Sequence, residues 1–419
     1  MKALTFLGAA KAHETIYIMP NGREYAAPYF GVALARFFPD ADMKVFVTDK
    51  AREMHWDSFQ RLAEDYVDNL EAVEIPDGAD ESELWSLFQT VVDAVNEREE
   101  VIFDITHGFR PLPFLSLLAV AYLRQVKQID LRAVLYGNFE ARDQSVAPHR
   151  TPVVDLSGFV SLFDWMTSAD RFTRFGDAGD LAEQLRKVKP SWQDQRADPA
   201  KREEAKRLSF AARSLDDVSM ALRLIRPAEA MDASSELNRR LADASQSIQV
   251  NARPFVSLVR SITDAYAPLA MPSSQQKVDL VGQLANERRM VDWLLDRKQY
   301  VQAVAIAREW IISWVMAQVE MDDILNKLKR REVEEILGKA LHERQGKHGS
   351  FNDVRFPNGN TLRSIGQISQ ALDIYAKLVN ARNDLLHAGK RRNPGKAKEM
   401  EKNVKNLCPR LAELRLPPA

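Results

Sequence analysis

Cysteine is nearly absent from this chain of 419 residues, in which Cys408 is the single one. One cysteine cannot form an intrachain disulfide, and it excludes zinc, haem and iron–sulfur sites built from several thiolates. A reducing cytoplasm is therefore the expected compartment. A secretory signal peptide is not expected, because the start of the chain is only minimally apolar and Lys11 and His13 stand where small residues should precede cleavage.

Long apolar runs are also missing. The longest uncharged apolar stretch, from Pro111 to Leu123, is well short of the roughly 18 residues that a membrane-spanning helix needs, so no membrane segment is expected.

The nucleotide-binding motifs G-x-G-x-x-G and G-x-x-x-x-G-K-[ST] do not occur either. Their absence argues against a dinucleotide oxidoreductase and against a P-loop NTPase. The histidines show no metal-ligand spacing such as H-E-x-x-H, so no metal site is expected.

The composition is otherwise that of a multidomain globular protein, with 45% hydrophobic and 28% charged residues. The net charge of −1 hides a difference between the two parts of the chain. Residues 1–160 carry 15 Lys and Arg against 25 Asp and Glu, whereas residues 161–419 carry 43 against 34. A basic second half suits contact with a polyanion, but a solvated helical surface gives the same count.

The first part of the chain alternates strand-like and helix-like segments, which predicts an α/β fold. One predicted strand, Glu100 to Thr106, contains the continuous apolar run Val101 to Phe103, which is typical of a strand covered on both faces in a parallel sheet. A Rossmann-like domain over 1–157 follows. The other predicted strands are Ala3 to Leu7, Lys44 to Thr48, Ala72 to Ile75, Leu131 to Tyr136 and Pro152 to Leu156, and predicted helices include Ser82 to Val95 and residues 111–125.

The second part of the sequence predicts an all-α structure, because from Ser157 onward apolar residues recur at intervals of three and four residues. The fold class is thus α/β plus all-α. Proline and glycine breakers suggest a helical connector over 158–270 and a terminal helical domain over 271–419. Arg344 to Asn360 is mostly polar and is predicted to be a loop, while Trp293, Trp310 and Trp314 are expected in the core.

The segment Asp104-Ile105-Thr106-His107-Gly108-Phe109-Arg110-Pro111 joins the buried strand to the next helix. Ligands of open α/β sheets bind beyond the carboxyl ends of strands, where a helix N-terminus favours phosphates. Thr106 and His107 offer donors, and Arg110 can bind a phosphate with its guanidinium. The same residues also fit an ordinary strand-to-helix turn, with Gly108 in the turn and Pro111 in the first turn of the helix.

A second polar group lies near the end of the chain. Leu362, Ile365, Ile368, Leu372, Tyr375 and Val379 recur at helical spacing, and the next positions on that face are Arg382 and Leu386. Asn383 and His387 are four residues apart beside Arg382, and Gly389 is expected to end the helix. Arginine and histidine suit RNA cleavage by its own 2′-hydroxyl, since histidine can move protons at neutral pH and arginine stabilises a phosphorane. On the residues alone, a cationic His387 placed against the helix C-terminus is the favoured interpretation.

Lys390-Arg391-Arg392 and the lysines up to Lys405 could follow a nucleic-acid backbone, or could belong to a solvated final helix.

Together the two segments resemble the CARF/HEPN ancillary ribonucleases of type III CRISPR systems. Asp104 to Pro113 is similar to the D-[IV]-T-H-G-[FL]-R-x-[LM]-P signature of their CARF domains, with companions at Phe6-Leu7-Gly8, Thr48-Asp49-Lys50-Ala51 and Tyr136 to Ala141. Arg382-Asn383-x-x-x-His387 resembles the HEPN motif R-x4-6-H. The first loop departs from the family, because Gly8-Ala9-Ala10 stands where related chains often have G-T-G.

The resemblance implies a cytoplasmic homodimer whose CARF domains bind a cyclic oligoadenylate, with cyclic tetra-adenylate expected, and whose HEPN domains cleave single-stranded RNA non-specifically in antiviral defence. No metal or other cofactor is implied, and 2′,3′-cyclic phosphate products are expected. The alternatives are a non-catalytic nucleotide-sensing regulator and a CARF domain that cleaves its own ligand. The implied catalytic residues are Arg382, Asn383 and His387, and the implied ligand-binding residues are Gly8, Ala9, Thr48, Thr106, His107, Gly108, Phe109, Arg110, Tyr136 and Gly137.

Overall fold

The computed structural model describes residues 1–107, 112–321, 323–344, 355–356, 359–387, 389–390 and 394–417. The chain divides into two compact units, Met1–Asp164 and Trp165–Ala419, called unit 1 and unit 2. The predicted division into three domains at 157 and 270 stays a prediction.

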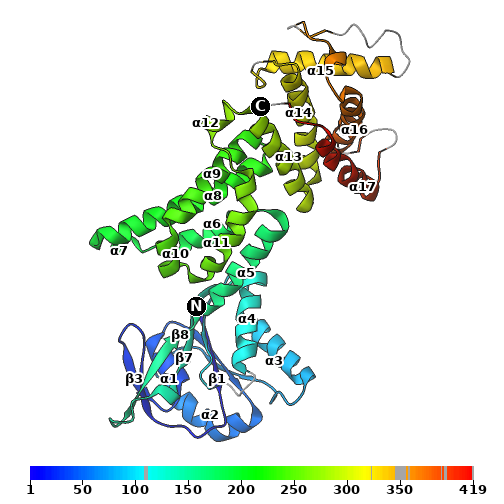
Figure 1. Cartoon of the computed structure of the whole chain (residues 1–419). Helices are drawn as coiled ribbons and strands as arrows, with labels where there is room; N and C mark the ends of the chain where they lie inside the picture. The colour runs from blue at the N-terminus through cyan, green and yellow to red at the C-terminus, as the bar shows by residue number, and fades with distance from the viewer. Residues whose placement is uncertain are drawn as a thin grey trace. The chain divides into compact units, whose positions relative to one another are not determined.

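Within its described residues, unit 1 holds an eight-stranded sheet in the order β3-β2-β8-β7-β6-β1-β4-β5 (Figure 1). The five strands from β7 to β5 run parallel, β8 is antiparallel to β7, and a short antiparallel pair, β2 and β3, extends the edge. The strands are β1 (Lys2–Leu7), β2 (Thr15–Ile18), β3 (Glu24–Ala27), β4 (Asp42–Val47), β5 (Leu70–Glu74), β6 (Glu100–Asp104), β7 (Asp130–Gly137) and β8 (His149–Asp155).

Helices cover both faces of this sheet, as the alternation of buried side chains in β1 illustrates. Ala3 and Leu7 pack into the core formed with α1 (Phe30–Phe37) and α2 (Asp49–Ala63). Leu4 and Phe6 point to the other face and pack with α3 (Glu81–Asp93) and α4 (Leu112–Val126). Successive residues of a strand point to opposite faces, so a strand covered on both sides is apolar throughout. The Rossmann-like prediction for this part of the chain is confirmed.

The six predicted strands are present with ends shifted by up to three residues, but β2 and β3 were missed. Each has only four residues, and the turn between them contains Gly22 in the left-handed region with φ +85°. Such short edge strands carry too little alternation to be recognised by pattern.

Unit 2 is helical, as predicted; among its described residues the only β pairing is an isolated bridge between Arg355 and Thr361. The linking helix α5 (Ser157–Phe175) spans the boundary between the units. The helices that follow are α6 (Gly179–Lys187), α7 (Trp192–Ala197), α8 (Pro199–Arg223), α9 (Pro227–Asp243), α10 (Ser245–Asn251), α11 (Arg253–Tyr266), α12 (Ser273–Gln276), α13 (Leu280–Asp296), α14 (Tyr300–Gln318), α15 (Lys327–Arg344), α16 (Ile368–Leu386) and α17 (Ala397–Leu407).

Helix α14 is the central element of the C-terminal helices. Trp310 and Trp314 are fully buried, and their indole N–H groups donate to the carbonyl oxygens of Leu284 (2.7 Å) and Arg415 (2.8 Å). Trp293 is also buried, so all three predicted core tryptophans are confirmed. A buried indole needs such an acceptor, which fixes the helix against its neighbours.

Helix α16, which carries the Arg382 motif, is shorter than the helical spacing from Leu362 suggests. Residues Leu362–Ser364 form a 3-10 turn, and Gln367 has a left-handed backbone with φ 64°, so the α-helix begins at Ile368. The predicted polar loop Arg344 to Asn360 lies largely outside the described residues. None of the helices described is long and apolar enough to cross a membrane.

Candidate functional site

The candidate ligand site of unit 1 lies where the chain changes direction in the sheet. Strand β1 is flanked by β4 on one side and by β6 on the other, and all three are parallel. Their carboxyl ends therefore meet at one edge. After β1 and the β2–β3 pair, the chain passes through α1 to β4 on one side of β1, whereas β6 on the other side leads through α4 to β7, so the strand order reverses between β1 and β6. Open α/β sheets bind ligands at such a switch point.

Asp104 at the end of β6 organises the loop that follows. Its carboxylate is fully buried, accepts a hydrogen bond from the Thr5 hydroxyl at 2.5 Å, and accepts another from the backbone N–H of Thr106 at 2.7 Å. Burial raises the pKa of Asp104 to about 6, and these hydrogen bonds lower it less than burial raises it. The Thr106 hydroxyl in turn accepts from the Gly137 N–H at 2.8 Å, which joins the ends of β6 and β7.

His107 is held in one tautomer by the backbone. The Phe30 N–H donates to His107 Nε2 at 3.1 Å, so the proton of the neutral ring lies on Nδ1. Burial, and then the nearby His55, lowers the pKa of His107 to about 4. At neutral pH the ring is therefore uncharged. His107 can offer a phosphate only one ring donor, the Nδ1–H, because Nε2 accepts from Phe30.

Gly8 lies in close contact with His107. A Cβ atom added at Gly8 would lie 2.6 Å from the His107 carbonyl oxygen, which is closer than any side chain permits. The loops after β1 and β6 thus touch through a glycine, and only glycine allows this approach.

A cavity of about 360 Å³ opens at these strand ends. Gly8, Ala9, Thr48 and His107 line it. Thr48 also caps α2, because its hydroxyl accepts from the Ala51 N–H at 3.4 Å. The cavity therefore combines a glycine loop, a hydroxyl and a helix N-terminus, a set that suits a phosphate-bearing ligand.

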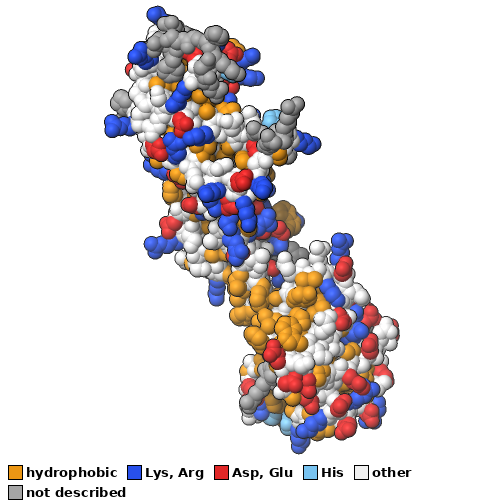
Figure 2. Space-filling model, turned by 90° about the vertical axis from the view of Figure 1, so that its right-hand side faces the viewer, with side chains coloured by type: hydrophobic (Ala, Val, Ile, Leu, Met, Phe, Trp, Pro, Cys, Tyr) orange, Lys and Arg blue, Asp and Glu red, His pale blue; other side chains and the backbone are white. Residues whose placement is uncertain are grey.

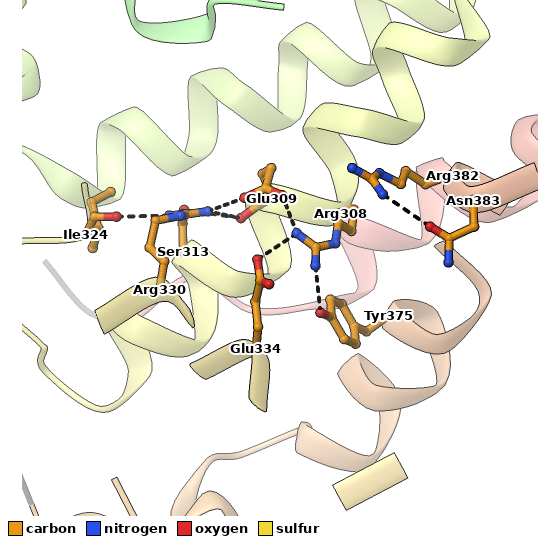
Figure 3. Close-up of polar contacts among 9 residues, drawn as sticks. All are labelled: Arg308, Glu309, Ser313, Ile324, Arg330, Glu334, Tyr375, Arg382 and Asn383. Atoms are coloured by element: carbon orange, nitrogen blue, oxygen red, sulfur yellow. Dashed lines mark hydrogen bonds and ion pairs between the residues drawn. The ribbon is translucent and has the colours of Figure 1, made fainter. Parts of the chain in front are cut away.

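The candidate catalytic site of unit 2 lies in the last turns of α16. The Arg382 guanidinium donates to the Asn383 side-chain oxygen at 3.2 Å (Figure 3). Arg382 also lines a cavity of about 280 Å³ together with Glu287, Arg308, Glu309 and Arg330. It is half-buried rather than enclosed in the core.

His387 stands apart from this pair. It is exposed and follows the last helical residue of α16, and Gly389 (φ +66°) donates its N–H to the Asp384 carbonyl at 3.0 Å. Gly389 therefore ends the helix as predicted. No hydrogen bond joins the His387 ring to Arg382 or Asn383 in the part of the chain that the structure describes.

Two further arginines hold the walls of the Arg382 cavity (Figure 3). Arg308 on α14 forms ion pairs with Glu309 and Glu334, the latter at 2.8 Å, and donates to the Tyr375 hydroxyl at 3.3 Å. Arg330 on α15 donates to Ser313 at 2.8 Å and pairs with Glu309 at 2.8 Å. These contacts tie α14, α15 and α16 together and fix the helix that carries Arg382.

Glu287 on α13 is the buried acid of this cavity. It is 7% exposed, and its nearest partner is the Gln283 amide, which donates at 3.2 Å. Burial raises the pKa of Glu287 to about 7, while Arg330 partly opposes this shift. Among the described residues, histidine, cysteine and acidic side chains do not gather in groups of three that could hold a metal.

Comparisons with known proteins agree with the strand-end geometry. Residues 3–140 match the family model of the CARF domain of the CRISPR system endoribonuclease Csx1, and residues 161–269 match the second domain of CRISPR-associated protein MJ1674. These two matches show similarity to CRISPR-associated proteins over most of the first 269 residues, with a CARF domain at residues 3–140.

Protein MJ1674 from Methanocaldococcus jannaschii is 29% identical over 126 residues. This match covers 26% of the present chain and 19% of that protein, so the chain spans about a fifth of the relative's length. Among solved structures, Enterococcus italicus Csm6 bound to cyclic hexa-2'-fluoro-hexa-dAMP aligns with 99% of this chain and 93% of that chain, at 12% identity and a TM-score of 0.39.

The structure brings most of the predicted CARF residues together and leaves others apart. Thr106 and Gly137 join beside the cavity, whereas Tyr136 lies within β7 opposite Val154 and does not line it. Gly108, Phe109 and Arg110 lie outside the described residues. The cavity also contains Lys50 and Asp77, which were not predicted as site residues; Lys50 follows Thr48 in a segment already singled out, but nothing in the sequence marks Asp77.

Proposed function

We propose that the CARF domain binds a cyclic oligoadenylate and that unit 2 is a HEPN ribonuclease, which cleaves single-stranded RNA without a metal ion when the ring is bound. One observation carries this proposal: Arg382, Asn383 and His387 occupy the end of one helix in a chain whose first unit is a CARF domain. The proposal places the protein in the cytoplasm, where foreign RNA would be the target.

The proposed chemistry uses the RNA as its own nucleophile. The 2′-oxygen attacks the adjacent phosphorus, the bond to the 5′-oxygen breaks, and a 2′,3′-cyclic phosphate and a 5′-hydroxyl result. His387 exchanges the protons that leave the 2′-hydroxyl and reach the 5′-oxygen, since histidine suits this role near neutral pH. The Arg382 guanidinium stabilises the charge on the phosphorane oxygens, and Asn383 holds that guanidinium at 3.2 Å.

A homodimer is part of the proposal, and exposed apolar surface on unit 1 supports it. Figure 2 shows hydrophobic side chains gathered on the face that carries α3 and α4. Trp85, Phe114, Tyr122 and Val126 on these helices are 62%, 66%, 44% and 54% exposed. Large apolar patches of this kind mark protein interfaces. Because α4 follows the Thr106 segment directly, a second copy placed here would bring two ligand sites close together.

Apolar side chains also surround the Arg382 cavity. Leu325 and Leu386 line it and are 73% and 47% exposed. A second copy packed on this surface would bury both leucines and bring the exposed His387 beside a second motif. A composite site of this kind would explain why His387 makes no contact with Arg382 in one chain.

Cyclic tetra-adenylate is the proposed activator, because a four-membered ring can share the twofold symmetry of a dimer. Each copy would offer the helix N-terminus at Thr48, the Lys50 ammonium and the His107 Nδ1–H to equivalent phosphates. Activation requires the ring to prefer the active arrangement. A hundredfold preference, about 2.7 kcal/mol, raises an active population of roughly 1% to about half.

A fluorogenic RNA assay tests the proposal. The full chain is incubated with linear tetra-adenylate or with rings of three, four and six adenylates, each with and without EDTA. We expect cleavage with the four-membered ring alone, unchanged by EDTA, and products that end in 2′,3′-cyclic phosphate by mass spectrometry. Light scattering should report a dimer of the 47.6 kDa chain. Ring binding without any RNA cleavage would instead favour a non-catalytic regulator.

A further inference from the structure

A groove between α16 and α17 stands beside the proposed catalytic residues and has no assigned role. It encloses about 510 Å³, a volume ordinary for a small-molecule site. Helix α16 contributes Lys377, Asn380 and Asp384 to its lining, and α17 contributes Asn403 and Asn406, followed by Arg410. The buried side chains of Ala381 and Leu407 form an apolar part of its wall.

Three side-chain amides give the groove its chemistry. Asn380, Asn403 and Asn406 are exposed, and within the described residues none of their amides makes a hydrogen bond to another protein group. Each amide has an acceptor oxygen and a donor NH₂ group, so the groove offers both kinds of partner at several points. Donors and acceptors beside an apolar wall are what a nucleobase requires: its edge forms hydrogen bonds while its face packs.

The charges in the groove favour a neutral ligand group over a phosphate. Lys377 and Arg410 both pair with Asp373, at 3.0 and 2.9 Å, and Arg410 also pairs with Glu413 at 3.3 Å. Their charges are therefore largely compensated. The Asp384 carboxylate is 7% exposed at the base of the groove and accepts from the Gly395 N–H at 3.0 Å.

The groove leads towards His387. Lys377, Asn380 and Asp384 recur at three and four residues, and the next position on this face of α16 is His387. A helix rises about 1.5 Å per residue, so His387 lies about 10 Å along the axis from Asn380. Arg382 faces the separate cavity with Leu386. A nucleotide held in the groove would therefore be only a short distance along the RNA from a phosphate bound at His387.

We propose that this groove binds a nucleobase of the RNA substrate next to the cleaved bond and sets the base preference of cleavage. The inference rests on the proposed ribonuclease function, which it deepens. Asn403 and Asn406 are the residues that read the base, and Asp384, held by Gly395, positions one wall of the groove.

The test compares base preference with binding in the full-length protein. RNA oligonucleotides that carry each of the four bases on either side of a single cleavable bond give kcat/KM for the activated wild type, Asn403→Ala and Asn406→Ala. Fluorescence anisotropy with fully 2′-O-methylated RNA of the same sequences measures binding without cleavage. Ser369→Ala is the matched control, because Ser369 is exposed on α16 and does not line the groove.

We expect each asparagine variant to reduce the preference between the best and the worst base by about fivefold or more, since a good amide-to-base contact discriminates by that much. Asn403→Asp, which exchanges a donor for an acceptor at equal size, should change which base is preferred. The control should behave as the wild type. The same variants should bind 2′-O-methyl RNA more weakly.

Failure of this inference and failure of the proposed function look different. If the wild type cleaves RNA and all groove variants retain its base preference and affinity, the nucleobase site is wrong while the ribonuclease stands. If no RNA is cleaved but 2′-O-methyl RNA binds in a manner that depends on Asn403, the groove stands and the ribonuclease does not. If no RNA binds and a protein partner needs these asparagines instead, the groove assignment is overturned.

Discussion

The two candidate sites differ in how much of each is completed within one chain. In the CARF domain the functional groups are tied to each other: Asp104 holds Thr106, Thr106 holds Gly137, and Phe30 holds His107. At the end of α16, Arg382 contacts Asn383, whereas His387 is exposed and joined to neither. The proposed ligand site is therefore preformed within one chain, whereas the proposed catalytic site would need a second copy to bring its groups together. This difference fits the proposed function, in which a ligand sensor controls a catalyst.

The strongest test of the comparison removes the proposed catalytic groups. Arg382→Ala or His387→Ala should reduce ring-activated RNA cleavage by about 10²–10⁴-fold, the usual value of a proton-transfer group or of a charge-stabilising donor. Ring affinity, measured by calorimetry, should be unchanged, because both residues belong to unit 2. The variants should unfold at the wild-type temperature, since neither side chain is part of the buried core.

Cleavage of RNA that carries 2′-O-methyl groups throughout would contradict the proposed mechanism directly. It would mean that the nucleophile is not the 2′-hydroxyl, so the proton transfer proposed for His387 would also be wrong.

A second test concerns Glu287, the buried acid that lines the same cavity as Arg382. Glu287 has a pKa of about 7 in the fold and an ordinary value of 4.5 when unfolded. Between these two values the folded state keeps a proton that the unfolded chain has released, so stability is lost as the pH rises from 4.5 to 7. Glu287→Gln should therefore leave stability nearly unchanged at low pH and raise the free energy of unfolding by about 3 kcal/mol above pH 7.

Urea denaturation at a series of pH values checks this expectation, with Glu335→Gln as the control. Glu335 is 58% exposed and pairs with Arg331 at 3.2 Å on the surface of α15. A surface pair contributes little, so the control should show no comparable dependence on pH. Equal gains for both variants would show that the cavity does not bury the charge of Glu287.

The sequence predicted more of the structure of unit 1 than of the candidate site in unit 2. The strands of unit 1 were predictable because Val101 to Phe103 is continuously apolar, and the long Asp104 to Pro113 signature indicated the CARF domain. The contact of Gly8 with His107 was not predictable, since it joins residues 99 positions apart through the pairing of β1 with β6. In unit 2 the motif was found, but nothing in its spacing shows that Arg308, Arg330 and Glu287 share a cavity with Arg382. The start of α16 was misplaced because the apolar spacing continues through the 3-10 turn at Leu362.

A third test uses the close contact in the CARF domain. Gly8→Ala places a methyl group 2.6 Å from the His107 carbonyl oxygen, so the two loops must separate. Overpacking of this kind costs about 1–2 kcal/mol, and we expect ring affinity to fall by about tenfold. RNA cleavage at saturating ring should be retained. Gly158→Ala is the matched control, because no atom lies within 4 Å of a Cβ added there.

The smallest expected effect separates capping from ligand binding at Thr48. Its hydroxyl accepts from the Ala51 N–H and lines the cavity, so it can also donate its proton to a ligand phosphate. Thr48→Ala should lower the free energy of unfolding by about 1 kcal/mol, the usual value of an N-cap, and weaken ring binding by about fivefold. Thr48→Asn keeps a capping side chain but changes the cavity, so it should restore stability and not ring affinity. Thermal unfolding and calorimetry measure the two effects independently. If Thr48→Asn restores both, the hydroxyl serves the helix alone, and the proposed ligand contacts of the CARF site must come from the backbone at the start of α2, the glycine loop, Lys50 and His107.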